Sequence, residues 1–152
     1  MIGGSLERQR RTIIFFRESP SDETVLNWIR DLPQHDRSAL GLDLDLVQDE
    51  WRAGEAGDAD GAPTERGGRV ATGLFGGFRK PKQGRPLCRK LDDRIWEMQS
   101  AMPSGKVTSL LLFAANLIVH VVHGQIKTAS AVPPELLVLA RARMDRMIKK
   151  IS

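Results

Sequence analysis

Four short apolar runs, separated by residues typical of tight turns, fill the stretch from Pro86 to Lys127 and constrain the fold more than any other feature. The runs read PLCRKL, IWEMQS, KVTSLLLF and LIVHVVHGQIK, and the turn signals DD, MPSG and AAN lie between them. Runs of this length and composition, at hairpin spacing, indicate β-strands. The sequence therefore predicts an antiparallel meander of four strands.

The N-terminal part predicts one strand and a pair of helices. The run RTIIFFRE is β-branched and aromatic, and the following SPSDE predicts a helix start with Ser21 or Asp22 as its N-cap. Apolar residues then recur at helical spacing until Pro33 ends the helix. In the next segment, HDRSALGLDLDLVQDEW, the leucines alternate as in a strand but also form a helical stripe. Its length and its acidic end favour a helix.

The remaining parts are a C-terminal helix and a glycine-rich insertion. The end PPELLVLARARMDRMIKKIS has proline where a first helical turn tolerates it, an apolar stripe, and lysines that suit a last turn. By contrast, residues 54–84 contain nine glycines and two prolines without a stable period, which predicts a long, partly mobile loop. With 152 residues, 41% of them hydrophobic, we expect one α+β domain over residues 11–151, after a flexible leader at residues 1–10.

Charge and cysteine content narrow the functional class. Residues 101–152 contain 7 basic and 2 acidic side chains, whereas residues 1–50 contain 6 basic and 10 acidic ones. The later segments therefore predict a surface that faces a polyanion. The single cysteine, Cys88, excludes an internal disulfide and fits a reducing cytoplasm. No Cys/His cluster has metal-ligand spacing, and no apolar run is long enough to cross a bilayer. We therefore expect a soluble cytoplasmic protein that needs no metal or other cofactor.

Basic residues alternate with apolar ones along the predicted meander, as in strands with one buried face. Arg89, Lys106, His120 and His123 follow this pattern. Arg85, in the loop before the meander, is a further candidate for electrostatic contact with phosphate. Such a face has the chemistry to hold an RNA phosphodiester, and to stabilise charge as a 2′-hydroxyl attacks the adjacent phosphate without a metal. The alternative is a solvated sheet face whose cations serve solubility alone.

One family resemblance is carried by the second half of the chain. The string PLCRKLDDRIWEMQSAMPSGKVTSLLLF, then VVHGQIK, a proline and a helix with ARARMDRM, resembles the HigB-like, phage-derived branch of the RelE/ParE toxin superfamily. The N-terminal strand and VLNWIRDLPQHDRSALGLDL are similar to the strand and helical hairpin that precede the sheet in those toxins. The resemblance covers most of residues 11–150 outside the insertion. It implies a RelE-like fold, with strand and helical hairpin packed on a small, mainly antiparallel sheet and a C-terminal helix.

The resemblance also implies a function. It implies the toxin of a type II toxin-antitoxin system, a metal-independent endoribonuclease that cleaves mRNA on the ribosome and is silenced by an antitoxin, commonly a helix-turn-helix protein. The matching positions imply that Lys106 and Lys127 stabilise phosphate charge and that His123 orients or transfers a proton. Arg89 and Lys90 match positions that bind RNA. We expect no membrane partner.

Several positions depart from the family pattern. The family usually has an arginine at Ser109, an aromatic at Gln125, a lysine at Thr128 and another lysine just before the proline, at Ala131 or Val132. Each lost phosphate contact costs about 1–3 kcal/mol, so together these changes lower the expected cleavage rate by orders of magnitude. Two alternatives remain open: a noncatalytic homologue that binds an antitoxin or ribosome without cleavage, and a ParE-like inhibitor of DNA gyrase.

Overall fold

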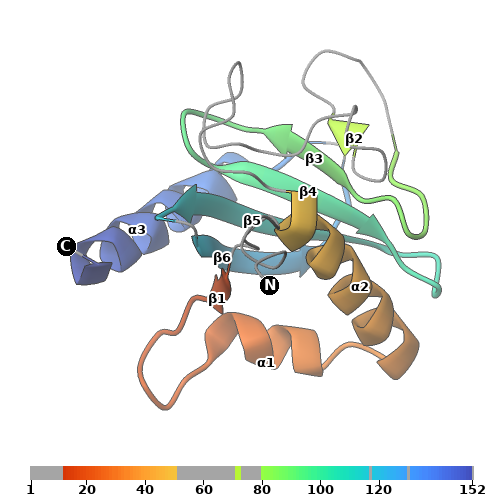
Figure 1. The fold of residues 1–152 in the computed structure, drawn as a ribbon, viewed down its shortest axis with the longest axis horizontal. Coiled ribbons are helices and arrows are strands. Elements are labelled where there is room, and N and C mark those ends of the chain that lie inside the picture. The colour runs from red at the N-terminus through yellow and green to blue at the C-terminus, as the bar shows by residue number, and fades with distance from the viewer. Residues whose placement is uncertain (1–11, 51–70, 73–79, 117, 130, 152) are drawn as a thin grey trace, which may run out of the picture.

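The computed structural model describes residues 12–50, 71–72, 80–116, 118–129 and 131–151. Within them the chain forms a strand, two helices, five strands and a final helix, an α+β arrangement as predicted (Figure 1). The elements are β1 (Thr12–Phe15), α1 (Thr24–Arg30), α2 (Gln34–Glu50), β2 (Ala71–Thr72), β3 (Leu87–Lys90), β4 (Trp96–Ala101), β5 (Val107–Ala115), β6 (Ile118–Ile126) and α3 (Pro134–Ile151).

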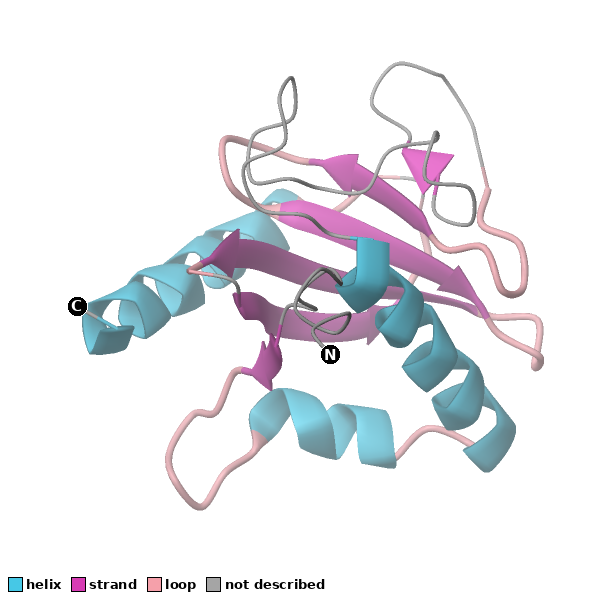
Figure 2. Ribbon diagram, in the orientation of Figure 1, coloured by secondary structure: helices cyan, strands magenta, loops and turns pink. Residues whose placement is uncertain are grey.

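All the described strands join one sheet, in the order β1-β6-β5-β4-β3-β2 (Figure 2). The central strands, β3 to β6, each pair antiparallel with their neighbours in the chain, which confirms the predicted meander. The two outer strands pair in parallel, β1 with β6 and β2 with β3. The sheet is therefore mixed although mainly antiparallel, and β1, the first strand in sequence, lies at one of its edges.

The turns of the meander have local causes. Between β3 and β4, Asp92 accepts hydrogen bonds from the backbone N–H groups of Arg94 and Ile95, at 3.0 and 2.9 Å. Between β4 and β5, Gly105 has a φ of 93°, which glycine adopts without steric cost. Between β5 and β6, Asn116 has a φ of 53°, and asparagine tolerates this conformation better than most residues. These turns lie where the sequence predicted them.

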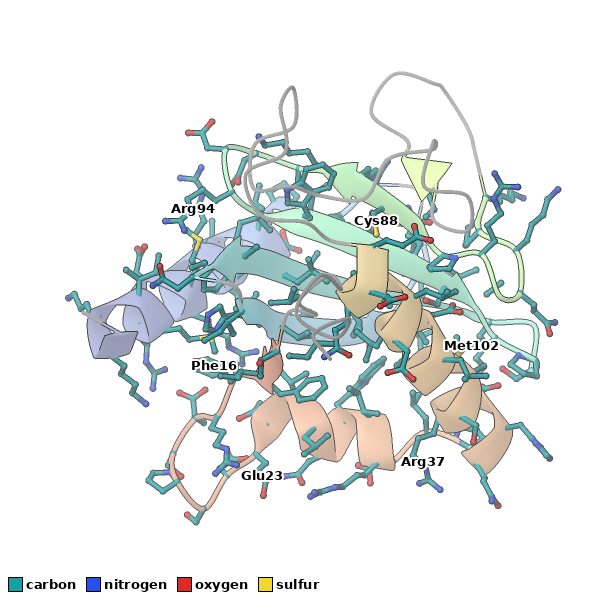
Figure 3. All side chains as sticks on the ribbon, in the orientation of Figure 1. Phe16, Glu23, Arg37, Cys88, Arg94 and Met102 are labelled. Carbon is teal, nitrogen blue, oxygen red and sulfur yellow. The ribbon has the colours of Figure 1, made fainter. Side chains whose placement is uncertain are left out.

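The α1–α2 pair covers one face of the sheet (Figure 1). Leu40, Leu44 and Val47 of α2 are buried in its core, whereas Leu42 is 66% exposed, so the leucine-rich segment follows the helical and not the strand pattern. Cys88 lies in the same core, labelled in Figure 3, and burial raises the pKa of its thiol. Cys88 is thus a free cysteine that fills space in the core.

The packing of α1 against β6 depends on one glycine. A Cβ atom placed on Gly124 would lie 2.6 Å from the Trp28 ring, closer than any real contact allows. Gly124 lies within the string VVHGQIK, which is part of the family resemblance, and its nearest neighbours are the side chains of Trp28 and Leu110.

The helix α3 packs on the opposite face, where Ala140 and Met144 contact Leu111, Phe113 and other apolar residues of β5 and β6. These two helical residues are four positions apart and belong to the predicted apolar stripe.

A β-bulge changes which side chains of β6 share a face. Leu111 of β5 pairs with His123, but Leu112 pairs with Val121, so Val122 is an extra residue in β6. Strict alternation would place the two histidines of β6, three positions apart, on opposite faces. With the extra residue, both lie on the face that carries α3.

Two details differ from the sequence prediction. The N-cap of α1 is Glu23, without a side-chain cap, and not Ser21 or Asp22, because Asp22 closes a turn with Ser19 before the helix begins. Within the predicted insertion, β2 pairs with β3, which the glycine-rich pattern did not indicate. The rest of residues 54–79 and the leader at residues 1–10 lie outside the described residues.

Candidate functional site

A group of polar side chains lies on the sheet face that carries α3. At its centre is Glu97 of β4, which is fully buried. Gln99 of β4 and Ser109 of β5 are buried beside it and lie opposite each other in the strand register. Arg89 of β3, which lies opposite Glu97, and Lys127, immediately after β6, complete the group. We refer to these five residues as the Glu97 cluster.

The carboxylate of Glu97 accepts four hydrogen bonds. Its Oε1 accepts from Arg89 Nε at 2.9 Å and Gln99 Nε2 at 3.1 Å. Its Oε2 accepts from Ser109 Oγ at 2.6 Å and Lys127 Nζ at 2.7 Å. A carboxylate has about four lone-pair sites, so the protein uses its full acceptor capacity. Glu97 can therefore act as a base toward a substrate only after losing one of these partners.

The cluster has two cations and one carboxylate, and so a net charge of +1. The Lys127 side chain is only 10% exposed, while that of Arg89 is 29% exposed. A buried charge is stable only when it is paired. Lys127 is thus the counter-ion of Glu97 in this arrangement, and Arg89 is the cation of the cluster nearer to solvent.

Lys106 lies next to Lys127 at the same end of the meander. The backbone N–H of Lys127 donates to the Val107 carbonyl at 2.7 Å, which aligns the start of β5 with the end of β6. Lys106 is exposed, and within the described part of the chain it has no ion-pair partner. Of the cations near the cluster, Lys106 is the one best placed to meet a ligand from solvent.

His123 lies on the same face, in register with Leu111, which is in turn in register with Glu97. Two strand spacings, about 10 Å, therefore separate the backbones of Glu97 and His123. Burial lowers the pKa of His123, and the positive charge of Arg143 on α3 lowers it further. A lowered pKa leaves the imidazole neutral at about pH 7, in the form that accepts a proton.

Two of the predicted RNA-binding residues lie elsewhere. Lys90 is next to Arg89 in β3 but is on the other face, where its ammonium lies 6.0 Å from the centre of the Trp96 ring. Arg85 is exposed in a turn that its backbone closes with Lys82. The structure therefore brings Arg89 and Lys127 together, with His123 on the same face and exposed Lys106 at the end of the meander near Lys127, but not Lys90 or Arg85.

The departures from the family pattern have different surroundings. The Ser109 hydroxyl donates to Glu97, and its small size leaves the same carboxylate oxygen accessible to Lys127. Gln125 lies opposite Ser109 in the register, on the same face. Thr128 is exposed beyond the end of β6. Only the first of these replacements is bonded into the cluster.

Glu97 was not among the residues predicted from the sequence, although it organises the site. Its signal was present in IWEMQS, where Glu97 and Gln99 alternate with Trp96 and Met98. Alternation in an interior strand places two polar side chains on one covered face, and a buried carboxylate there requires cationic partners.

Among the described residues, no three His, Cys, Asp or Glu side chains are grouped so that they could hold a metal ion. No helix formed by these described residues has the length and apolar character needed to span a membrane. No protein-family model, curated protein or solved structure matches this chain. The chain is thus described by its α+β fold and by an ion-paired polar cluster within its sheet.

Proposed function

We propose that this chain is the toxin of a type II toxin-antitoxin system, with a RelE-like fold of the HigB-like branch, and that it cleaves mRNA on the ribosome in the cytoplasm. The resemblance in sequence supports this, and one structural observation carries it. Arg89, His123 and Lys127 share one face of the meander, and exposed Lys106 lies just before β5, at the end of the meander where Lys127 follows β6. An antitoxin of the helix-turn-helix class is the expected partner.

The proposed cleavage needs only side chains and the RNA itself. The 2′-hydroxyl attacks the adjacent phosphorus, the 5′-oxygen of the next nucleotide leaves, and a 2′,3′-cyclic phosphate forms. Neutral His123 accepts the 2′-hydroxyl proton, because its lowered pKa keeps it unprotonated. Lys106 lies in solvent, where its ammonium can stabilise the phosphate charge and protonate the leaving oxygen. Arg89, partly exposed, contributes to phosphate binding.

A second candidate function is favoured by a specific observation. Lys127 is held by Glu97 at 2.7 Å and is nearly buried, so this expected phosphate contact is already engaged within the protein. A chain that has lost this contact and those at Ser109 and Thr128 would bind its antitoxin or the ribosome without cleaving RNA. The loss of three contacts at about 1–3 kcal/mol each is enough to abolish measurable cleavage.

Controlled expression in bacteria distinguishes these functions. The nuclease arrests growth, and sequencing of RNA ends shows new cuts within translated reading frames. His123→Ala and Lys106→Met should each relieve the arrest, whereas Lys82→Met, at an exposed turn away from the cluster, should not. Normal growth with unchanged RNA ends would refute cleavage and favour the binding homologue. Arrest with intact mRNA and a block of gyrase supercoiling would instead indicate ParE-like activity.

A further inference from the structure

A second site lies at the β1 edge of the sheet, which is the edge opposite β2. It lies between β1, β6 and the end of α3. It is a cavity of about 220 Å³. Ile14, Phe16 and Met147 give it apolar walls, and His120 of β6 lines it as well. Phe16 is labelled in Figure 3, at the junction of β1 with the loop that leads to α1. None of these residues belongs to the Glu97 cluster.

His120 is an unusual residue to line such a cavity. It is only 3% exposed, and neither of its ring nitrogens has a hydrogen-bond partner in the part of the chain described. One face of its ring is stacked on Phe113, with ring centres 4.6 Å apart. A neutral imidazole always presents one N–H donor and one acceptor. Buried groups of this kind normally have a partner, and the cavity is where a ligand could supply one.

The rim of the cavity is cationic. Arg17, Arg146 and Lys150 all line it. Arg146 is held in place by an ion pair with Glu18 at 2.7 Å and by its position 5.1 Å from the centre of the Phe16 ring. Arg17 and Lys150 have no ion-pair partner among the described residues. The rim therefore has an excess of positive charge directed at whatever enters the cavity.

We propose that this cavity binds a small organic anion with a compact apolar body, of the size of an aromatic carboxylate or an aryl phosphate. The apolar body packs against Ile14, Phe16 and Met147, and His120 donates a hydrogen bond to a ligand oxygen. The anionic group lies at the rim, near Arg17 and Lys150. A cavity of about 150 Å³ is enough for a benzene molecule, so this one has room for a ring and its anionic substituent. The site is separate from the proposed nuclease face and does not depend on that function.

Titration of the full chain with benzoate, phenyl phosphate and benzyl alcohol tests the proposal. These probes share one ring and differ in charge, so the first two distinguish a carboxylate from a phosphate and the third isolates the ring. We expect saturable binding of at least one anion, about tenfold tighter than that of the alcohol. NMR signals of the His120 ring should shift on binding, while those of exposed His35 on α2 should not.

Variants separate the site from general effects on folding. Arg17→Met combined with Lys150→Met changes only exposed rim residues, and it should remove the preference for the anions while the protein stays folded. His120→Phe preserves the stacking surface but removes the donor, and should weaken binding about tenfold. The matched control Lys82→Met should bind as the unchanged protein does. Equal affinity for the alcohol and the anions, an unaltered preference in the rim variant, or no saturable binding up to about 10 mM would overturn the proposal.

Discussion

Replacing Glu97 with glutamine removes a negative charge from the centre of the sheet. The volume of the side chain stays nearly the same. The amide has one oxygen in place of two, so at most two of the four donors that face the carboxylate keep an acceptor. The hydroxyl of Ser109 and the amide of Gln99 can reorient, but the Lys127 ammonium and the Arg89 guanidinium can only donate. The substitution therefore removes the counter-ion that Lys127 and Arg89 share within the cluster.

The size of the effect follows from burial. Removing one partner of a buried ion pair typically costs about 3–5 kcal/mol, because the remaining charge is left uncompensated. Arg89 is 29% exposed and Lys127 is 10% exposed, so partial solvation reduces the cost. We expect Glu97→Gln to lower the free energy of unfolding by about 3 kcal/mol. Adding Lys127→Met to it should restore part of this loss, because the least exposed cation is then removed.

Urea denaturation followed by circular dichroism measures both effects. The matched control is Arg141→Met, which removes the ion pair between Arg141 and Asp92. This pair has the same 2.7 Å length as the pair between Lys127 and Glu97, but the Arg141 side chain is 53% exposed. Such exposed pairs contribute little, so this control should leave the unfolding midpoint almost unchanged. A loss for Glu97→Gln no larger than that of the control would show that Glu97 does not stabilise the fold as a buried counter-ion. So would a double variant that is less stable than Glu97→Gln alone.

Three other predictions concern a buried carboxyl group, two glycines and the proposed general base. Burial raises the pKa of Asp43 to about 6 from 3.8, so folding favours the protonated form and stability is lost as pH rises from about 4 to 6. After allowance for solvent screening, Asp43→Asn should be about 1–2 kcal/mol more stable than the unchanged protein at pH 7 and equal to it below pH 4, by thermal unfolding. Gly124→Ala should lower the unfolding free energy by about 1–3 kcal/mol because its Cβ meets Trp28, whereas Gly41→Ala, with open space around it, should raise it by up to about 1 kcal/mol. Cleavage should rise with pH through the lowered pKa of His123 and then level off, and His123→Ala should reduce the plateau rate about 10²- to 10⁴-fold.

Local signals in the sequence were sufficient for most of the fold. The turn residues and the apolar runs between Pro86 and Lys127 predicted the meander, because a hairpin is specified by residues close together in the chain. The length and acidic end of the leucine-rich segment favoured a helix over a strand. The structure agrees, because Leu40, Leu44 and Val47 share the buried face of that helix. The parallel pairing of β1 with β6 was not predictable in this way, because it joins residues more than 100 positions apart.

The candidate site was harder to predict, for physical reasons. Alternation correctly separates Arg89 from its neighbour Lys90, but it fails for the histidines of β6, since a single bulged residue shifts one of them to the other face. The family resemblance also implied that Lys127 faces a phosphate. Its burial against Glu97 depends on the approach of three strands, which no local pattern encodes.

The most direct test of the proposed function is to incubate the purified chain with mRNA on translating ribosomes and to map the ends of the fragments. We expect cuts inside the reading frame that require translation, with 2′,3′-cyclic phosphate on the upstream fragment. Intact mRNA at stoichiometric amounts of a folded chain, or fragments that end in a 3′-hydroxyl, would contradict the proposed function.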